Sequence, residues 1–440
     1  MVTTSKKADP FSIVRFEITD LPSEMDGTLV EYYIAAGDNV DRDQLCKRTL
    51  KLLPAGRPLR IGLLSCNGIF RVTDENRRYV LWRTLKEEVV VHKVDLLIHA
   101  GDQIYADSVY MQQIGKAANT SLNQIEILAA EYRKIYFDTW TAPEIQAVLE
   151  SCPSFMMWDD HDIYDGYGSH GDDSSPLAQT LFAAAKIAFQ DFQTQQNPAP
   201  LSENSFAFTT RLDDVAILVL DARSNRMWKQ CRILGDAEIH DLEASLETML
   251  NNPPPRFLLI VTAIPFVHVP VLSYLKLFEK IQWKGALLED LRDSWTAQNN
   301  QEEARRILSA FFRFKTASPA TEVILLGGDV HVATLGSLES RLPEHSLPDG
   351  TASRIHQIVS SGIGSPPPFG IVRMLLEWAA EEKVTLLDEA FSGELRRLSS
   401  PNQHYLLSKR NFAVLQLGSE PTVEFFADYK GKVIRFLEKL

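Results

Sequence analysis

Short apolar runs alternate with stretches of helical period over most of the chain. In the first half, apolar runs predict buried strands at 61–65, 96–100 and 155–158, and helical periodicity predicts helices at 77–91, 124–136, 142–149 and 176–193. In the second half, strands are expected at 206–211, 215–220, 257–262, 323–326, 355–360, 412–417 and 423–427, with a helix at 236–250. Alternating strands and helices indicate an α/β fold, and two strand-rich halves predict two sheets packed face to face with helices outside.

The two ends of this pattern are less regular. Residues 1–55 contain short alternating segments, such as Thr28 to Tyr33, and predict a small β-rich section. Pro54 to Gly56 marks its boundary with the main domain, residues 56–440. Three prolines at 366–368 precede an amphipathic helical pattern near 374–382, so the segment 365–400 is either a lid over a site or a surface excursion.

Composition narrows the class of protein. The chain has 440 residues, of which 45% are hydrophobic and 23% charged, as in ordinary soluble domains. Its net charge of -13 argues against a nucleic-acid partner, although a bound metal would still allow a phosphate substrate. No secretion signal and no apolar stretch long enough to span a membrane is visible in the sequence. Four cysteines without close pairing favour a reducing, cytoplasmic location.

Three predicted strands run directly into acidic residues or into an acidic residue with histidine. The strand at 155–158 leads into Asp159 to Asp162, a run that contains three carboxylates and one imidazole. The strand at 96–100 leads into Gly101 and Asp102, and the strand at 323–326 leads into Gly327 to His331. Crowded carboxylates and imidazoles repel or compete for protons unless a metal neutralises them. The sequence therefore predicts a metal-dependent hydrolase.

The residues of two of these strand ends suggest separate roles. Asp160 can ligate a metal while His161 faces a cleft as a proton donor, with Asp162 holding the imidazole in one tautomer. A solvated acidic loop is the alternative. Asp329 and His331 are two residues apart, so their side chains would share a face of an extended segment and could ligate one metal. A hydrogen-bonded structural pair is the alternative for them.

Neighbouring residues add weaker signals. Asp102 after a glycine could bridge two ions, although Gly-Asp also occurs in ordinary turns. Tyr105 could reach the same metal as a phenolate or serve as a core aromatic, and Asp107 is expected to be structural. Cys66 follows the strand at 61–65, where a buried cysteine is usually inert. Arg223 could clamp a phosphate or simply pair with a nearby carboxylate.

At these residues the chain resembles the PhoD-like metallophosphoesterases, the alkaline phosphatase D branch of the calcineurin-like superfamily. The matching segments occur in the family's order over about residues 60 to 335, namely 65–67 (SCN), 101–107 (GDQIYAD), 158–162 (WDDHD), 220–223 (LDAR) and 328–331 (GDVH). Residues 360–363 and the last two predicted strands extend the resemblance. Each segment alone is common, but the ordered set is specific.

The resemblance implies a four-layer αββα sandwich with a metal cluster at the strand ends. It implies that the metal ligands are Cys66, Asp102, Tyr105, Asp160, Asp329 and His331. Cys66 and Tyr105 would hold a ferric ion, and Asp102 would bridge two metals. Asp160 would take the place of the superfamily's asparagine ligand, and His161 that of its catalytic histidine.

The expected function is hydrolysis of a small-molecule phosphoric mono- or diester, with a metal-activated water as nucleophile and His161 as general acid. Thiolate, phenolate and carboxylate ligands together suit Fe³⁺ and Ca²⁺, with Mn²⁺ or Zn²⁺ as the alternative. Phospholipase-type diester cleavage and a non-catalytic scaffold on a decayed phosphatase fold remain open. The chain departs from the superfamily at 260–265, where many members carry a ligand histidine and this sequence has none.

Overall fold

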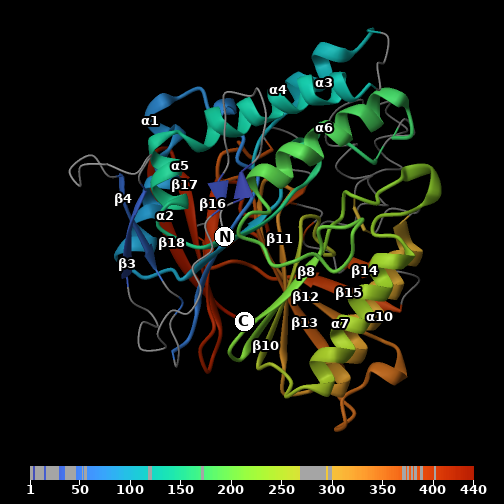
Figure 1. The fold of residues 1–440 in the computed structure, drawn as a ribbon. Coiled ribbons are helices and arrows are strands. Elements are labelled where there is room, and N and C mark those ends of the chain that lie inside the picture. The colour runs from blue at the N-terminus through green and yellow to red at the C-terminus, as the bar shows by residue number, and fades with distance from the viewer. Residues whose placement is uncertain are drawn as a thin grey trace.

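The structure is a computed structural model. It describes residues 3–4, 14–15, 29–34, 46–51, 53, 57–116, 121–169, 173–267, 294–295, 300–368, 373, 376–377, 380, 384–386, 390–400 and 403–440. Two large mixed sheets lie face to face in the middle of the molecule, and helices cover their outer faces (Figure 1). This arrangement confirms the predicted α/β sandwich.

The first sheet has six strands in the order β18-β17-β16-β5-β6-β7. Three of them run parallel, β5 (Arg60–Leu64), β6 (Leu96–Ala100) and β7 (Ser154–Met157). The other three strands are antiparallel and extend the sheet beyond β5. They are β16 (Asn411–Gln416), β17 (Thr422–Tyr429) and β18 (Lys432–Lys439). β6 is buried at every position because it lies between two parallel strands and is covered on both faces.

The second sheet has eight strands in the order β14-β15-β12-β13-β11-β10-β9-β8. Its parallel part consists of β9 (Val215–Val219), β10 (Phe257–Thr262), β11 (Glu322–Gly327) and β13 (Arg354–Ser360). Antiparallel strands flank it, β8 (Phe208–Leu212), β12 (Ala333–Ser340), β14 (Val384–Leu386) and β15 (Phe391–Leu395).

Helices cover the outer faces of both sheets, and two of them, Leu122–Trp140 and Pro176–Phe192, pack instead against the core between the sheets. The described helices are α1 (Glu75–Arg78), α2 (Val80–Val90), α3 (Asp107–Gln113), α4 (Leu122–Trp140), α5 (Pro143–Leu149), α6 (Pro176–Phe192), α7 (Asp236–Asn251) and α10 (Gln301–Ala317). Local sequence explains where some of them begin. The Ser121 and Ser175 side chains accept a backbone hydrogen bond in the first turns of α4 and α6, as N-cap residues do.

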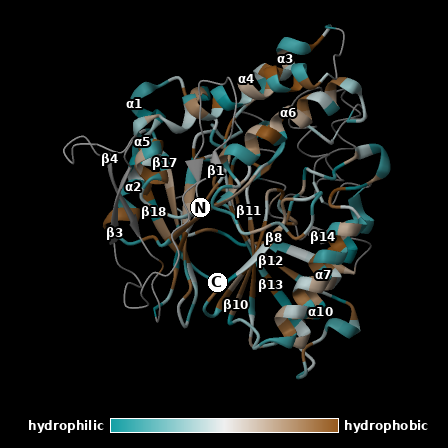
Figure 2. Cartoon of the chain, viewed as in Figure 1, coloured by the Kyte–Doolittle hydropathy of each residue, from teal (hydrophilic) through white to brown (hydrophobic). Residues whose placement is uncertain are grey.

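Hydrophobic residues divide into three layers, as the alternation along the central strands requires. The inner faces of the two sheets share one core, which includes Ile98 of β6 and Leu259 of β10. The outer face of the six-stranded sheet packs against α2 through residues such as Leu97 and Trp82, and α7 and α10 cover the other outer face. The central strands are largely hydrophobic, and the helices carry hydrophilic residues on their outer sides (Figure 2).

The predicted elements agree with these bounds within a few residues, with some differences. The helix expected at 77–91 is two helices, α1 and α2, separated at Tyr79. In the main domain the sequence interpretation omitted α3, α10, β12, β14, β15 and β18; β12 carries Gly336 at its centre, and glycine is a poor strand former. Much of the helical pattern near 374–382 lies outside the described residues, whereas 391–395 is a strand of the large sheet.

Two further observations concern the N-terminal section and the possibility of a membrane-spanning helix. Within residues 1–55 the structure describes two small sheets, β1 (Thr3–Thr4) with β2 (Val14–Arg15) and β3 (Leu29–Ile34) with β4 (Cys46–Lys51). The boundary at residue 55 stays a prediction. Among the described residues, no helix has the length and apolar character needed to cross a bilayer.

Candidate metal centre

The parallel strands of both sheets end at one place, and the candidate ligands follow these ends directly. Cys66 comes after β5, Asp102 after β6, Asp160 after β7 and Asp329 after β11. Backbone hydrogen bonds tie the loops together, because Cys66 N donates to Gly101 O over 3.2 Å and Asn67 N donates to Asp102 O over 2.8 Å. Residues far apart in the chain therefore surround one small volume, as is usual at the carboxyl ends of parallel strands.

The described residues contain three overlapping groups of potential metal ligands. Within each group, the ligand atoms all lie within 4.8 Å of one another. The groups are Cys66, Asp102 and His331; Asp102, Asp160 and His161; and Asp102, Asp159, Asp160 and Asp329. Asp102 belongs to all three groups, which is the position that a ligand shared by two ions would need. Asp159, which the sequence interpretation did not assign, joins the third group.

Four of the predicted ligands have a left-handed backbone conformation. The φ angles are 54° at Cys66, 57° at Asp102, 65° at Asp329 and 53° at His331. Such angles cost non-glycine residues about 1–3 kcal/mol each and concentrate at functional sites. The fold thus tolerates backbone strain where the candidate ligands sit.

Two glycines let the ligand loops approach each other. A Cβ atom on Gly101, whose φ is 88°, would lie 2.6 Å from Cβ of Asp159. A Cβ atom on Gly328 would lie 2.6 Å from Cβ of Ser65. Both distances are too short for carbon atoms, so only glycine fits at these positions.

The electrostatics of Asp102 favour a bound cation. Burial raises the pKa of its carboxyl well above the usual value; His161 opposes this rise, while Asp160 and Asp159 add to it. Asp102 Oδ1 has no hydrogen-bond partner among the described residues. A buried carboxylate oxygen without a partner is costly, and a cation in contact with it would remove that cost.

Cys66 and Tyr105 face the same volume. The Cys66 thiol is fully buried, and burial, with Asp102 and Asp329, raises its pKa well above the usual value. The Tyr105 hydroxyl lies 3.3 Å from Asp102 Oδ2 and 3.0 Å from His331 Nε2. Burial likewise raises the pKa of Tyr105. Both groups would become anionic only beside a strong positive charge, which a metal ion supplies.

The two site histidines are in different states. Burial lowers the pKa of His331 to about 3, so its imidazole is neutral, as a metal ligand must be. Burial also opposes a proton on His161, but Asp160, Asp102 and Asp107 outweigh it and raise the pKa to about 10. His161 Nδ1 lies 2.8 Å from Asp107 Oδ1, and its Nε2 lies 3.9 Å from Asp165 Oδ1.

The prediction that Asp162 orients His161 is therefore wrong, because the carboxylate bound to the His161 ring belongs to Asp107. Asp162 accepts hydrogen bonds from the backbone amides of Asp102 and Asp159, each over 2.9 Å, and from Gln193 Nε2 over 2.9 Å. It fixes the two ligand loops to each other. Asp107, expected to be only structural, takes the orienting position from the first turn of α3.

The structure also contradicts the predicted contact between Arg223 and a phosphate. The Arg223 side chain is completely buried, and its Nε donates to Asp159 Oδ1. Its Nη1 donates to the backbone oxygen of Tyr167 over 2.9 Å, and its Nη2 lies 3.5 Å from Asp160 Oδ1. Arg223 therefore holds the carboxylates of Asp159 and Asp160 in place. This is the structural pairing with a carboxylate that the sequence offered as the alternative.

Comparison with known proteins decides the family. The model of the PhoD-like phosphatase family matches residues 61–404, which is most of the chain. The chain belongs to the PhoD-like phosphatase family.

Individual relatives of this PhoD-like chain are distant. The uncharacterized protein YGR266W of Saccharomyces cerevisiae is 22% identical over 409 residues, covering 71% of this chain and 58% of that protein. The chain thus spans less than two thirds of that relative's length. The solved structure of PhoD aligns with 94% of this chain and 74% of its own, at 16% identity and a TM-score of 0.56, which shows a shared fold. A purple acid phosphatase, PPD1 from yellow lupin (Lupinus luteus) seeds, aligns at 11% identity over 89% of this chain and 56% of its own, with a TM-score of 0.45.

The end of β10 bears on the missing histidine of this PhoD-like chain. A Cβ atom on Gly101 would lie 3.2 Å from Cβ of Ala263, so the residue after β10 reaches the site but offers no ligand. His268 lies outside the described residues.

Proposed function

We propose that the chain is a metal-dependent phosphoesterase that hydrolyses small-molecule phosphoric mono- or diesters. The observation that carries this proposal is the convergence on Asp102 of carboxylates, a thiol, a phenol and two imidazoles from both sheets. The unpartnered Asp102 Oδ1 supports it, since these donors suit a cation better than any arrangement of protons. Membership in the phosphatase family supplies the reaction class.

The donor set suggests how two ions would be held. Cys66, Tyr105 and His331 suit a ferric ion, because thiolate, phenolate and imidazole are ligands for that metal. Asp160 and Asp329 offer oxygen ligands to a harder ion such as Ca²⁺, with Mn²⁺ or Zn²⁺ as the alternative for the pair. When bound, the ions would neutralise phosphoryl oxygens and lower the pKa of a water molecule for attack.

The chain itself would manage the proton of the leaving group. Asp107 fixes the ring of His161 through Nδ1, so that Nε2 would hold the proton that the leaving alkoxide takes up. The Tyr105 ring lies 4.1 Å from the His161 ring, centre to centre, and restricts its rotation. Arg223 would act only indirectly, by holding Asp159 and Asp160 in place.

Elemental analysis of the purified full chain, combined with a screen of phosphomonoesters and diesters, tests the proposal. We expect stoichiometric transition metal and turnover that a strong chelator abolishes. Asp102→Ala is the matched variant, and it should lose both metal and activity. Metal-free protein without turnover would favour the non-catalytic scaffold, whereas preference for glycerophospholipid diesters would favour the phospholipase alternative.

The free thiols bear on the cellular location of the chain. We propose a reducing compartment such as the cytoplasm, because Cys66, Cys152 and Cys231 are free thiols and Cys66 would have to remain reduced to bind iron. Fractionation of cells that express the full chain tests this proposal, and recovery from the medium would contradict it.

A further inference from the structure

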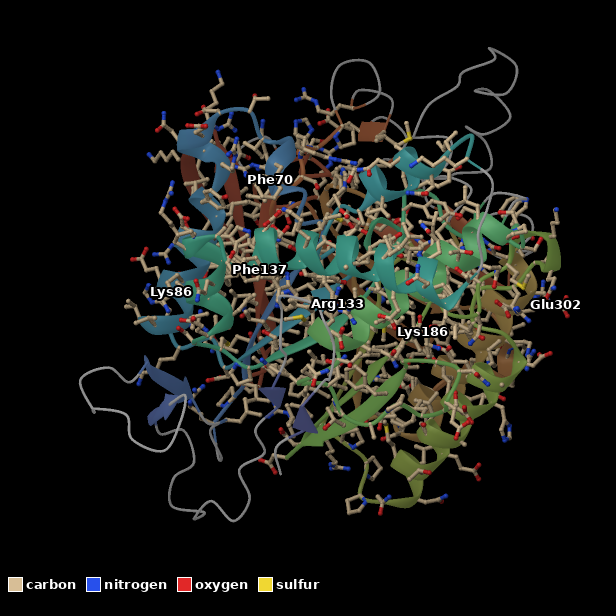
Figure 3. All side chains as sticks on the ribbon, turned by 45° about the horizontal axis from the view of Figure 1, so that its top comes forward. Phe70, Lys86, Arg133, Phe137, Lys186 and Glu302 are labelled. Atoms are coloured by element: carbon tan, nitrogen blue, oxygen red, sulfur yellow. The ribbon has the colours of Figure 1, made fainter. Side chains whose placement is uncertain are left out.

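Arg71 lies at the edge of the metal centre but belongs to none of its ligand groups. It ends the short helix η3 (Ile69–Arg71), which follows the Cys66 loop. Its side chain is 42% exposed, and Phe70 just before it is also at the surface (Figure 3). The Arg71 Cζ atom lies 4.1 Å from the centre of the Tyr105 ring, whose hydroxyl reaches Asp102. Arg71 is thus one aromatic ring away from the candidate ligands.

The guanidinium of Arg71 has donors to spare. Its Nη2 donates to Asp107 Oδ2 over 3.0 Å, while its Nε and Nη1 donate no hydrogen bond to any described residue. Arg223, by contrast, is fully buried and already bonded to protein oxygens. An arginine presents five N–H donors in a planar fork that matches carboxylate and phosphate oxygens. Stacking on Tyr105 holds the plane of this fork, which lowers the entropy lost on binding an anion.

The contact with Asp107 places Arg71 on the side of the leaving group. One oxygen of Asp107 binds His161 Nδ1 and the other binds Arg71. If His161 protonates the leaving oxygen, then the substituents of that oxygen extend past His161 toward its neighbours. The ion pair between Arg71 and Asp107 is partly exposed, so it is weak and can share its cation with an incoming anion.

We propose that Arg71 forms an anion subsite that selects phosphate esters whose leaving group carries a second anionic group, such as a carboxylate or another phosphate. This inference rests on the proposed phosphoesterase function. It makes Arg71 a specificity-determining residue, because an ester with an uncharged leaving group gains nothing from the unused donors. It also places a cation beside the site in a chain whose net charge of -13 otherwise disfavours the approach of an anionic substrate.

Two esters that differ mainly in one group test the subsite. 3-Phosphoglycerate carries a carboxylate on its leaving group, and glycerol 3-phosphate carries a hydroxymethyl group at the same place. Calorimetry on the full, metal-loaded chain carrying His161→Ala, in which turnover is slow, would give their dissociation constants with Arg71 intact and with Arg71→Ala or Arg71→Lys. Arg83→Ala is the matched control, since Arg83 is 49% exposed and pairs with one carboxylate, Glu144, but contacts no site residue.

We expect Arg71→Ala to weaken binding of 3-phosphoglycerate by about 10- to 100-fold and of glycerol 3-phosphate by less than about 3-fold, the loss of one charge-assisted contact. Arg71→Lys should recover part of the difference, and Arg83→Ala should change neither constant. An equal loss for both esters would mean that Arg71 acts only by holding Asp107, and no loss for either would leave it without a role; each result overturns the subsite.

Parallel turnover measurements separate the two proposals. Selective binding without hydrolysis would reject the phosphoesterase function and keep the subsite, and hydrolysis of both esters without selectivity would do the reverse.

Discussion

Replacing Asp107 by asparagine tests the proton-transfer arrangement of the site most directly. The substitution keeps the shape of the side chain but removes the charge beside His161 Nδ1, which lies 2.8 Å from Asp107 Oδ1. An asparagine oxygen can still accept one hydrogen bond, so the ring keeps a partner but loses its charged one. A hydrogen bond to a charged group contributes about 1.5–3 kcal/mol, which corresponds to roughly 10- to 150-fold in rate.

The expected loss stays below the upper end of this range. The Asp107 side chain is 27% exposed and shares its charge with Arg71, so solvent and the second cation already weaken its effect on His161. We therefore expect kcat on an alkyl phosphate to fall about 10- to 100-fold in Asp107→Asn. On p-nitrophenyl phosphate the fall should be smaller, because that leaving group needs little protonation. Metal content should stay unchanged, since Asp107 belongs to none of the ligand groups.

Asp162→Asn is the informative control, because the sequence alone would have assigned it the same role. Its Oδ2 accepts the backbone amides of Asp102 and Asp159, each at 2.9 Å, and its Oδ1 accepts Gln193 Nε2 at 2.9 Å, so the NH₂ group of an asparagine would face donors on one of the two sides. Each unsatisfied buried donor costs about 1–3 kcal/mol, so Asp162→Asn should lower the free energy of unfolding by about 2–6 kcal/mol. Thermal unfolding and steady-state kinetics on both substrates distinguish the two variants. If Asp107→Asn keeps its parent kcat on the alkyl ester, or slows both esters equally, Asp107 does not assist a general acid.

Three further outcomes are expected, two at the metal centre and one at the ion pair between Arg410 and Asp428. His161→Ala should keep most of its metal and lose about 10²- to 10⁴-fold in kcat on a poor leaving group, and a complete loss of metal in elemental analysis would contradict the acid role. Cys66→Ser should weaken or shift a visible absorption band of the iron-loaded protein and lower its activity; an unchanged spectrum and turnover would show that the thiol is inert. Asp428→Asn should lower the free energy of unfolding at pH 7 by about 3 kcal/mol, because it leaves the buried Arg410 without its carboxylate. Although burial opposes it, hydrogen bonds from Arg410 and Arg77 hold the pKa of Asp428 below its usual range, so this stabilisation is present at neutral pH and is lost as pH falls through the folded pKa; denaturation curves for parent and variant should converge in acid.

The sequence by itself determined the strands and the residues that follow them. Apolar runs are local signals, and the run at 96–100 predicted the bounds of β6 correctly. Because carboxyl ends of parallel strands meet at one edge, the identity of Asp102, Asp160 and Asp329 was enough to predict that they come together. Cys66 was an ambiguous signal until the family resemblance was considered, since a lone buried cysteine carries no information about its neighbours.

Only the tertiary structure decided which side chains touch. Asp162 is adjacent to His161 in the chain, yet Asp107, 54 residues from His161, is its partner. The reason is the short helix η4 (Asp160–Asp162), in which successive side chains point in different directions, so that Asp162 turns back to the amides of the β6 loop. The burial of each arginine also depends on tertiary packing. Arg223 is buried against Asp159, whereas Arg71 is partly exposed beside Tyr105. The packing of distant loops decides this difference, because no local pattern around either arginine indicates it.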